Sequence, residues 1–212
     1  FNVIFAWLLI SIGFMSGLPT PAGYSGAGKV ENAQVVITSV AGNSPAAGAG
    51  IKTGDAVKSV SAGTLVLADV TPESISEFIK NHENDAITIF YERSEEKLES
   101  VVTPIEGIAP DRKAIGISMD MIGTLQLPLH LAFFEGAKTT ASLTKAVTVG
   151  LGVFIFDAVM GRGDFSQVTG PVGIVGMVGD ASALGFITLL SFTAFISINL
   201  AVINIIPFPA LD

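Results

Sequence analysis

Two long stretches without any charged residue flank a polar middle segment, and this pattern limits the possible folds more than any other feature. Residues 1–28 and 181–211 contain no Asp, Glu, Lys or Arg, whereas the segment from Lys29 to Glu106 has a mixed composition. Over the whole chain only 14% of the residues are charged, against about 25% in ordinary soluble domains. The simplest interpretation is a membrane protein in which two apolar segments flank one soluble module.

The first apolar run predicts a membrane-spanning helix over residues 1–18. At 1.5 Å per residue this helix would be about 27 Å long, close to the roughly 30 Å of a hydrocarbon core. Pro19 and Pro21 follow directly and cannot continue a helix. We therefore expect the chain to leave the membrane at this point.

The last apolar run predicts a second transmembrane helix over residues 183–206. Asn199 and Asn204 lie inside it. A side-chain amide within a membrane helix requires partners, supplied either by another helix or by a functional cavity. Both alternatives stay open for Asn199.

Residues 106–180 are predicted to form a membrane-proximal region of helices and loops, with a short strand in the alternating run that begins at Ala114. The uncharged stretch 146–156 within it is too short to cross a bilayer. A helix on the membrane surface, or packed against other helices, is the favoured interpretation. A third span that includes Lys145 is the alternative.

The middle segment predicts a compact α+β domain. Pro45 follows Asn43 and Ser44 and begins a short helix, and Thr71 begins another that extends to about Asn81. The β-branched and alternating stretches predict strands at residues 34–40, 56–62, 86–93 and 97–105. The run N-S-P-A-A-x-A-G-I-K-x-G-D, from Asn43 to Asp55, resembles the signature of PDZ domains of the bacterial protease type.

This resemblance covers residues 23–105 and implies that the domain binds peptide C-termini as an added strand. Gly23, Tyr24 and Gly26 are the candidates for the loop that binds the terminal carboxylate. A plain flexible linker is the alternative interpretation of the same stretch.

The end of the chain carries the pattern that bears on chemistry. The run N-I-I-P-F-P-A-L-D, residues 204–212, resembles the N-x-x-P-x-P-x-L-D-G motif of site-2 proteases, which are intramembrane zinc metalloproteases. Residues 169–174, T-G-P-V-G-I, resemble an element that precedes the last core helix of that family. Asn2 and Ala6 match the end of its G-P-x-x-N-x-x-x-A motif. These patterns occur in the family's order, and RseP-like members with a single PDZ domain are the most similar.

The resemblance implies a zinc ion (Zn²⁺) held by Asp212 and by two histidines of an H-E-x-x-H motif on a preceding helix. Zinc with three protein ligands keeps a position open for water and lowers the pKa of that water, and the glutamate of the motif acts as general base. Asn204, with Pro207 and Pro209, is implied to help position the substrate.

The histidines of such a site are not found in this sequence. Its two histidines are His82 and His130, and neither belongs to an H-E-x-x-H motif. His82 is expected to be a solvated residue of the soluble domain and His130 an interfacial residue. We therefore expect the motif upstream of Phe1 in the complete protein, and we expect the present chain alone to be inactive.

The predicted fold is a membrane α-helical core, with two spans in this chain, and an inserted α+β PDZ domain. The predicted function is regulated intramembrane proteolysis: hydrolysis of transmembrane segments in substrates such as anti-sigma-factor-like proteins or signal-peptide remnants, with the PDZ domain gating or reading them. By the resemblance, the protein is a multi-pass protein of the bacterial inner membrane with its PDZ domain outside the cytoplasm.

Other classes of function find less support in the sequence. A membrane scaffold whose PDZ domain recruits partners without catalysis is the alternative. The net charge of −8 argues against a nucleic-acid partner. A serine hydrolase has little support, because the sequence contains no G-x-S-x-G motif.

Overall fold

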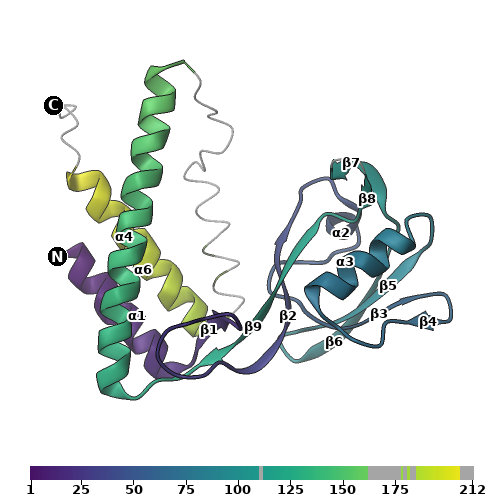
Figure 1. Cartoon of the computed structure of the whole chain (residues 1–212), viewed down its shortest axis with the longest axis horizontal. Helices are drawn as coiled ribbons and strands as arrows, with labels where there is room; N and C mark the ends of the chain where they lie inside the picture. The colour runs from purple at the N-terminus through teal and green to yellow at the C-terminus, as the bar shows by residue number, and fades with distance from the viewer. Residues whose placement is uncertain (110–111, 162–177, 179–180, 182–184, 206–212) are drawn as a thin grey trace. The chain divides into compact units, whose positions relative to one another are not determined.

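The computed structural model describes residues 1–109, 112–161, 178, 181 and 185–205 of the 212-residue chain. The chain divides into two compact units, which Figure 1 shows. The helical unit comprises Phe1–Pro19, Ser25–Lys29 and Leu125–Asp212, and the sheet unit comprises Thr20–Tyr24 and Val30–Thr124. This division follows the distribution of charge along the sequence.

Three helices form the described part of the helical unit: α1 (Asn2–Ser16), α4 (Leu129–Val159) and α6 (Phe186–Ile205). α1 ends where Gly17 adopts a left-handed conformation with φ of 93°, which a residue with a Cβ atom rarely takes. α1 packs against both α4 and α6, and α4 also packs against α6 (Figure 1).

The helices that are long and apolar enough to cross a membrane differ from the two predicted spans. By length and composition they are Leu129–Val159 and Phe186–Asn204. α6 agrees with the span predicted at residues 183–206, as far as the described residues reach. α1 has only 15 residues, fewer than the roughly 20 that a span usually needs.

The second difference lies in the region where the sequence favoured helices and loops at the membrane surface. α4 continues through Lys138 and Lys145 because its sequence contains no proline to interrupt it. The length of α4 therefore agrees better with the alternative interpretation, a span that includes Lys145, than with a short helix on the membrane surface.

α1 and α4 approach each other closely near a glycine. A Cβ atom at Gly136 of α4 would collide with the Oγ atom of Ser11 on α1. Nearby, Trp7 Nε1 donates a hydrogen bond of 2.8 Å to the carbonyl of Phe133, and the two rings meet edge to face at 5.5 Å. A small residue at a helix crossing is typical of packing in membranes, where close contact between helices supplies much of the stability.

The sheet unit is built on one seven-stranded sheet with strand order β1-β9-β2-β3-β5-β6, in which β4 also pairs with β3. A separate two-stranded sheet consists of β7 and β8. The strands are β1 (Leu18–Pro21), β2 (Glu31–Val40), β3 (Ala56–Ala62), β4 (Leu65–Val66), β5 (Ile87–Arg93), β6 (Glu96–Val102), β7 (Ile105–Ala109), β8 (Arg112–Ala114) and β9 (Ile117–Leu125).

Both helices of the sheet unit begin as the sequence predicts. α2 (Pro45–Gly48) follows Ser44, whose Oγ accepts the backbone N–H of Ala47 at 3.2 Å. α3 (Pro72–Asn81) begins with a capping box, in which Thr71 and Ser74 each bond the other's backbone N–H. Such caps replace hydrogen bonds that the first turn of a helix cannot make internally.

The core of the sheet unit lies between α3 and the sheet. Ile75 and Ile79 of α3 are buried against aliphatic side chains of the strands, which include Val35, Ile37, Val57, Val60, Ile87 and Ile89. Full burial of each such side chain stabilises the fold by about 1.5–3 kcal/mol. This packing fixes α3 in its position on the sheet.

A buried ion pair links the loop before β3 to the end of β5. Arg93 Nε and Nη2 donate to the two carboxylate oxygens of Asp55 at 2.6 and 2.7 Å. Asp55 is fully buried, and its Oδ2 also accepts the backbone N–H of Lys52 at 2.8 Å. The hydrogen bond that Arg93 donates to Asp55 raises the pKa of the Arg93 guanidinium above its ordinary value, although burial opposes this shift.

The sheet unit extends further along the chain than the limit predicted at residue 105. β9 pairs antiparallel with β2, from Ile117 opposite Val40 to Thr124 opposite Glu31. Residues 117–124, predicted to belong to the membrane-proximal region, therefore add a strand to the main sheet, whereas β7 and β8 form the separate two-stranded sheet.

Candidate functional site

The C-terminal motif lies on α6 and on the residues that follow it. Asn204 is in the last turn of α6, with its side chain exposed. Pro207, Pro209 and Asp212 lie outside the described residues, as do residues 169–174. Of the predicted site residues in this motif, the structure therefore describes only Asn204.

α6 lies beside the start of α1, which carries Asn2 and Ala6, the two residues that resemble the family's G-P-x-x-N-x-x-x-A motif. Ser197 Oγ of α6 donates to the backbone carbonyl of Asn2 at 3.0 Å. Ala6 of α1 is fully buried, as are Ala194 and Ile198 of α6. Residues from the two ends of the sequence, nearly two hundred positions apart, thus meet in one helical layer.

Polar side chains within the helices mostly bond their own helix. Asn199 Nδ2 donates to the carbonyl of Phe195 at 2.8 Å, a bond inside α6 that does not join two helices. In α4, Thr140, Thr144 and Thr148 each donate to the carbonyl four residues earlier, at 2.7 Å. These bonds satisfy the hydroxyl donors within the helix, which lipid tails could not do because they contain no hydrogen-bond acceptor.

A buried carboxylate also lies in α4. Glu135 is only 4% exposed, and its Oε1 contacts Lys138 Nζ at 2.9 Å. An ionisable group in a membrane helix is costly without such a partner. The side chain of Lys138 itself is 56% exposed.

The described residues do not contain a site that fits zinc. Among them, no three His, Cys, Asp or Glu side chains lie close enough together to hold a metal ion. His82 follows α3 and contacts the carbonyl of Phe78 through Nδ1 at 2.8 Å, and His130 is exposed at the start of α4.

The sheet unit contains a groove between α3 and the turn that joins β8 to β9. Its lining consists of Ser76, Ile79 and Lys80 from α3, and of residues 112–117 on the other side. Ile79 and Ile115 form an apolar floor and are 7% and 2% exposed. Its basic lining residues are Lys80, Arg112 and Lys113, and Glu73 and Glu77 of α3 line the adjoining pocket.

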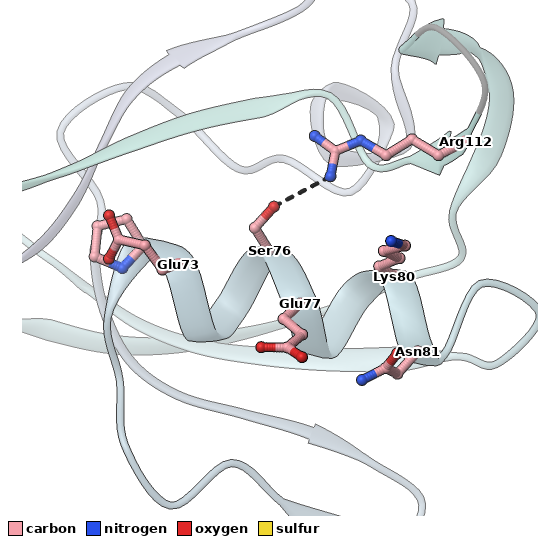
Figure 2. Close-up of a pocket in the computed structure, with 7 residues that line it drawn as sticks. Glu73, Ser76, Glu77, Lys80, Asn81 and Arg112 are labelled. Atoms are coloured by element: carbon pink, nitrogen blue, oxygen red, sulfur yellow. Dashed lines mark hydrogen bonds between the residues drawn. The ribbon is translucent and has the colours of Figure 1, made fainter.

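Figure 2 shows Arg112 extending from β8 towards α3, above the row of side chains on that helix. Its Nη1 donates to Ser76 Oγ at 3.3 Å, while Lys113 Nζ donates to Asn84 Oδ1 at 2.8 Å. Two of the basic side chains are thus held near the groove by neutral partners. A guanidinium held in this way remains able to attract an anion.

The residues predicted to bind a peptide carboxylate lie at and after the turn that follows β1. Gly23 is in the turn after β1, Tyr24 donates its backbone N–H to Pro21, and Gly26 belongs to the helical unit. None of these residues lines the groove at α3. The sequence signal for the groove is the apolar-Gly-apolar run at residues 115–117 directly before an alternating strand.

The sequence also matches known proteins over its whole length. The model of peptidase family M50 matches residues 1–212. The chain is 27% identical to the zinc metalloprotease RasP of Bacillus licheniformis and to the regulator of sigma-W protease RasP of Bacillus subtilis, covering 100% of this chain and 45% of each relative. It is 31% identical to a putative zinc metalloprotease of Nostoc, covering 56% of that protein.

The chain therefore spans about half the length of the curated relatives that it matches. The family model, by contrast, matches the full chain, including the helical unit, the sheet unit and the motif after α6. The chain belongs to peptidase family M50, the family of the site-2 proteases.

Proposed function

We propose that the complete protein is an intramembrane zinc metalloendopeptidase that hydrolyses peptide bonds in transmembrane segments of other proteins. The observation that carries this proposal is the family match over residues 1–212, together with the helices that can cross a membrane. The names of the relatives support it, because they are called zinc metalloproteases.

In this proposal Asp212 is one zinc ligand, and the histidines of an H-E-x-x-H motif elsewhere in the complete protein are the others. A carboxylate and two imidazoles form a ligand set that zinc accepts in catalytic sites. Asn204 precedes Pro207 by three positions in the sequence, and we assign Asn204, Pro207 and Pro209 to substrate positioning. The exposed side chain of Asn204 is available for that role.

We assign the protein to the bacterial inner membrane as a multi-pass protein, with the sheet unit outside the cytoplasm. The contact between Ser197, in the second half of α6, and Asn2, at the start of α1, supports opposite directions for these helices. The chain contains no cysteine, so single cysteines introduced at Asn81 and at Phe1 can be labelled from either side to test this topology.

The sheet unit serves in this proposal as a PDZ domain that binds peptide C-termini. The groove between α3 and β9 supports this role, since it combines an apolar floor, basic lining residues and an open strand. Extended peptides bind such sites by adding a strand to the sheet. The domain would thereby read or gate substrates before they reach the membrane site.

The proposed substrates are membrane proteins already shortened by another protease, such as anti-sigma-factor-like proteins or remnants of signal peptides. The name of the Bacillus subtilis relative, regulator of sigma-W protease, supports the first of these classes. The acidic net charge of −8 supports protein rather than nucleic-acid partners.

The experiment that tests this function is cleavage of a transmembrane substrate by the complete protein in detergent. Wild type is compared with Asp212→Ala and with the matched control Asp85→Ala, whose side chain is exposed on the sheet unit. We expect cleavage by wild type and by the control, and none by Asp212→Ala. Absence of cleavage in all three would support the scaffold instead.

A further inference from the structure

Among the residues that the structure describes, the edge of β9 that faces away from β2 is unpaired over a short length and closed at both ends. Ala41 N–H donates to Gly116 O at 2.8 Å, and Val40 lies opposite Ile117. This arrangement makes Val40 and Ile117 a non-hydrogen-bonded pair, so the N–H and C=O of Ile117 point to the outer edge. Every second residue repeats this orientation, which places the backbone groups of Met119 and Met121 on the same edge.

The first end of this edge is a turn with two backbone N–H groups directed into the groove. Ala46 and Ala41 donate to the carbonyls of Ile115 and Gly116 at 3.0 and 2.8 Å. Because a trans peptide is planar, the N–H groups of Gly116 and Ile117 point the opposite way. Adjacent N–H groups beside a residue of positive φ, here 82° at Gly116, form a concavity that binds anions.

The second end of the edge is closed by the chain's own segment. Ala22 N–H donates to Met121 O at 2.7 Å, directly after β1, which is the strand paired with β9 on this side. The N–H of Met121 is also bonded, to Oδ1 of Asp120 at 2.7 Å. Tyr24 N–H then donates to Pro21 O, and this turn directs the chain away.

The open part of the edge therefore extends from Ile117 to Asp120. At about 3.3 Å per residue this is roughly 13 Å, enough for two pairs of backbone hydrogen bonds, at Ile117 and Met119. The occupant with matching chemistry is the free C-terminal end of an extended peptide. Its carboxylate suits the two N–H groups and the positive charges of Lys80 and Arg112, and its terminal side chain suits the apolar floor.

We propose that the segment Thr20–Ala22 is a stop that limits strand addition on β9 to the last three or four residues of a ligand. This inference rests on the proposed peptide-binding function of the groove. Beyond those residues the ligand must leave the sheet, because both backbone groups of Met121 are occupied. Longer ligands then gain no further hydrogen bonds from this strand.

The test is binding of fluorescent peptides of three, four, six and eight residues to the complete protein in detergent. All peptides share the same apolar C-terminal residue and a free carboxylate. We expect affinity to rise from three to four residues and then to change by less than about twofold up to eight. A steady rise of at least tenfold between four and eight residues would overturn the stop.

Variants at Ala22 test the same inference independently. Ala22→Pro removes the N–H that reaches Met121, whereas the matched control Ala22→Ser keeps it. One or two additional backbone hydrogen bonds should give the eight-residue peptide a gain of about five- to tenfold in Ala22→Pro only. Equal affinity of the two variants for the eight-residue peptide would contradict the stop. If Ala22→Pro fails to fold, the peptide-length series in wild type is the test.

Failure of the underlying function gives a different result. If no peptide binds at any length, or if amidation of the C-terminus and Arg112→Glu leave affinity unchanged, the groove does not bind chain ends, and the stop fails with it. If binding requires the peptide carboxylate but affinity rises with peptide length, the stop is refuted and the peptide-binding function is not. Proteolysis is judged separately, by the cleavage assay with Asp212→Ala.

Discussion

Removing either partner of the buried ion pair between Asp55 and Arg93 should destabilise the sheet unit, but by different amounts. Arg93→Met leaves the Asp55 carboxylate, whose side chain is 1% exposed, with the backbone N–H of Lys52 as its remaining bond. An uncompensated charge of this kind costs about 4–5 kcal/mol. Asp55→Asn leaves a guanidinium that is 29% exposed and can regain water, so we expect a loss of about 2–3 kcal/mol.

Hydrogen exchange of the complete protein in detergent measures this difference. Backbone amides of β5 and β6 that exchange only when the sheet unit opens report its free energy of opening. At 1.36 kcal/mol per tenfold change, Arg93→Met should raise their exchange rates by roughly a thousandfold or more. Asp55→Asn should raise them by roughly thirty- to two-hundredfold.

An exposed ion pair on the same sheet provides the matched control. Lys58 Nζ and Glu92 Oε2 are 3.2 Å apart, with side chains 44% and 33% exposed. Lys58→Met should cost less than about 1 kcal/mol, because solvent screens such a pair. If Arg93→Met costs no more than this control, or less than Asp55→Asn, the reasoning from burial of the carboxylate is refuted.

Three further predictions concern single positions. Gly116→Ala should destabilise the sheet unit by at least about 2 kcal/mol in hydrogen exchange, because φ is 82° and the new Cβ would lie 2.7 Å from Ser44 Oγ. Thr71→Ala should cost about 1 kcal/mol and increase exchange at the start of α3, since the capping box is lost. Gly136→Leu should lower the thermal denaturation midpoint in detergent by disrupting the crossing of α1 and α4, whereas Gly150→Leu, with open space around it, should not.

Local signals in the sequence predicted most of the sheet unit. Pro45 after Ser44, and Thr71 three residues before Ser74, determine helix starts through short-range hydrogen bonds. Alternation of apolar residues likewise predicted the hairpin of β5 and β6, whose register runs from Ile87 opposite Val102 to Arg93 opposite Glu96. These features depend on neighbours within a few residues, which is why pattern reasoning finds them.

Features that depend on distant partners were harder to predict. The charges of Lys138 and Lys145 made the length of α4 hard to predict, because a charged side chain does not end a helix and this stretch contains no proline that would. The groove was missed because it joins α3 to residues about forty positions later in the sequence. The role of Asp212 stays a prediction from the motif, since that residue lies outside the described part of the chain.

The most direct test of the proposed protease is the zinc content of the complete protein purified in detergent. Wild type and the control Asp85→Ala should each retain about one zinc ion per chain, as expected for a single catalytic site. Asp212→Ala should lose most of this zinc, because one of three protein ligands is removed. Wild-type protein without zinc, or Asp212→Ala with unchanged zinc content, would contradict the account.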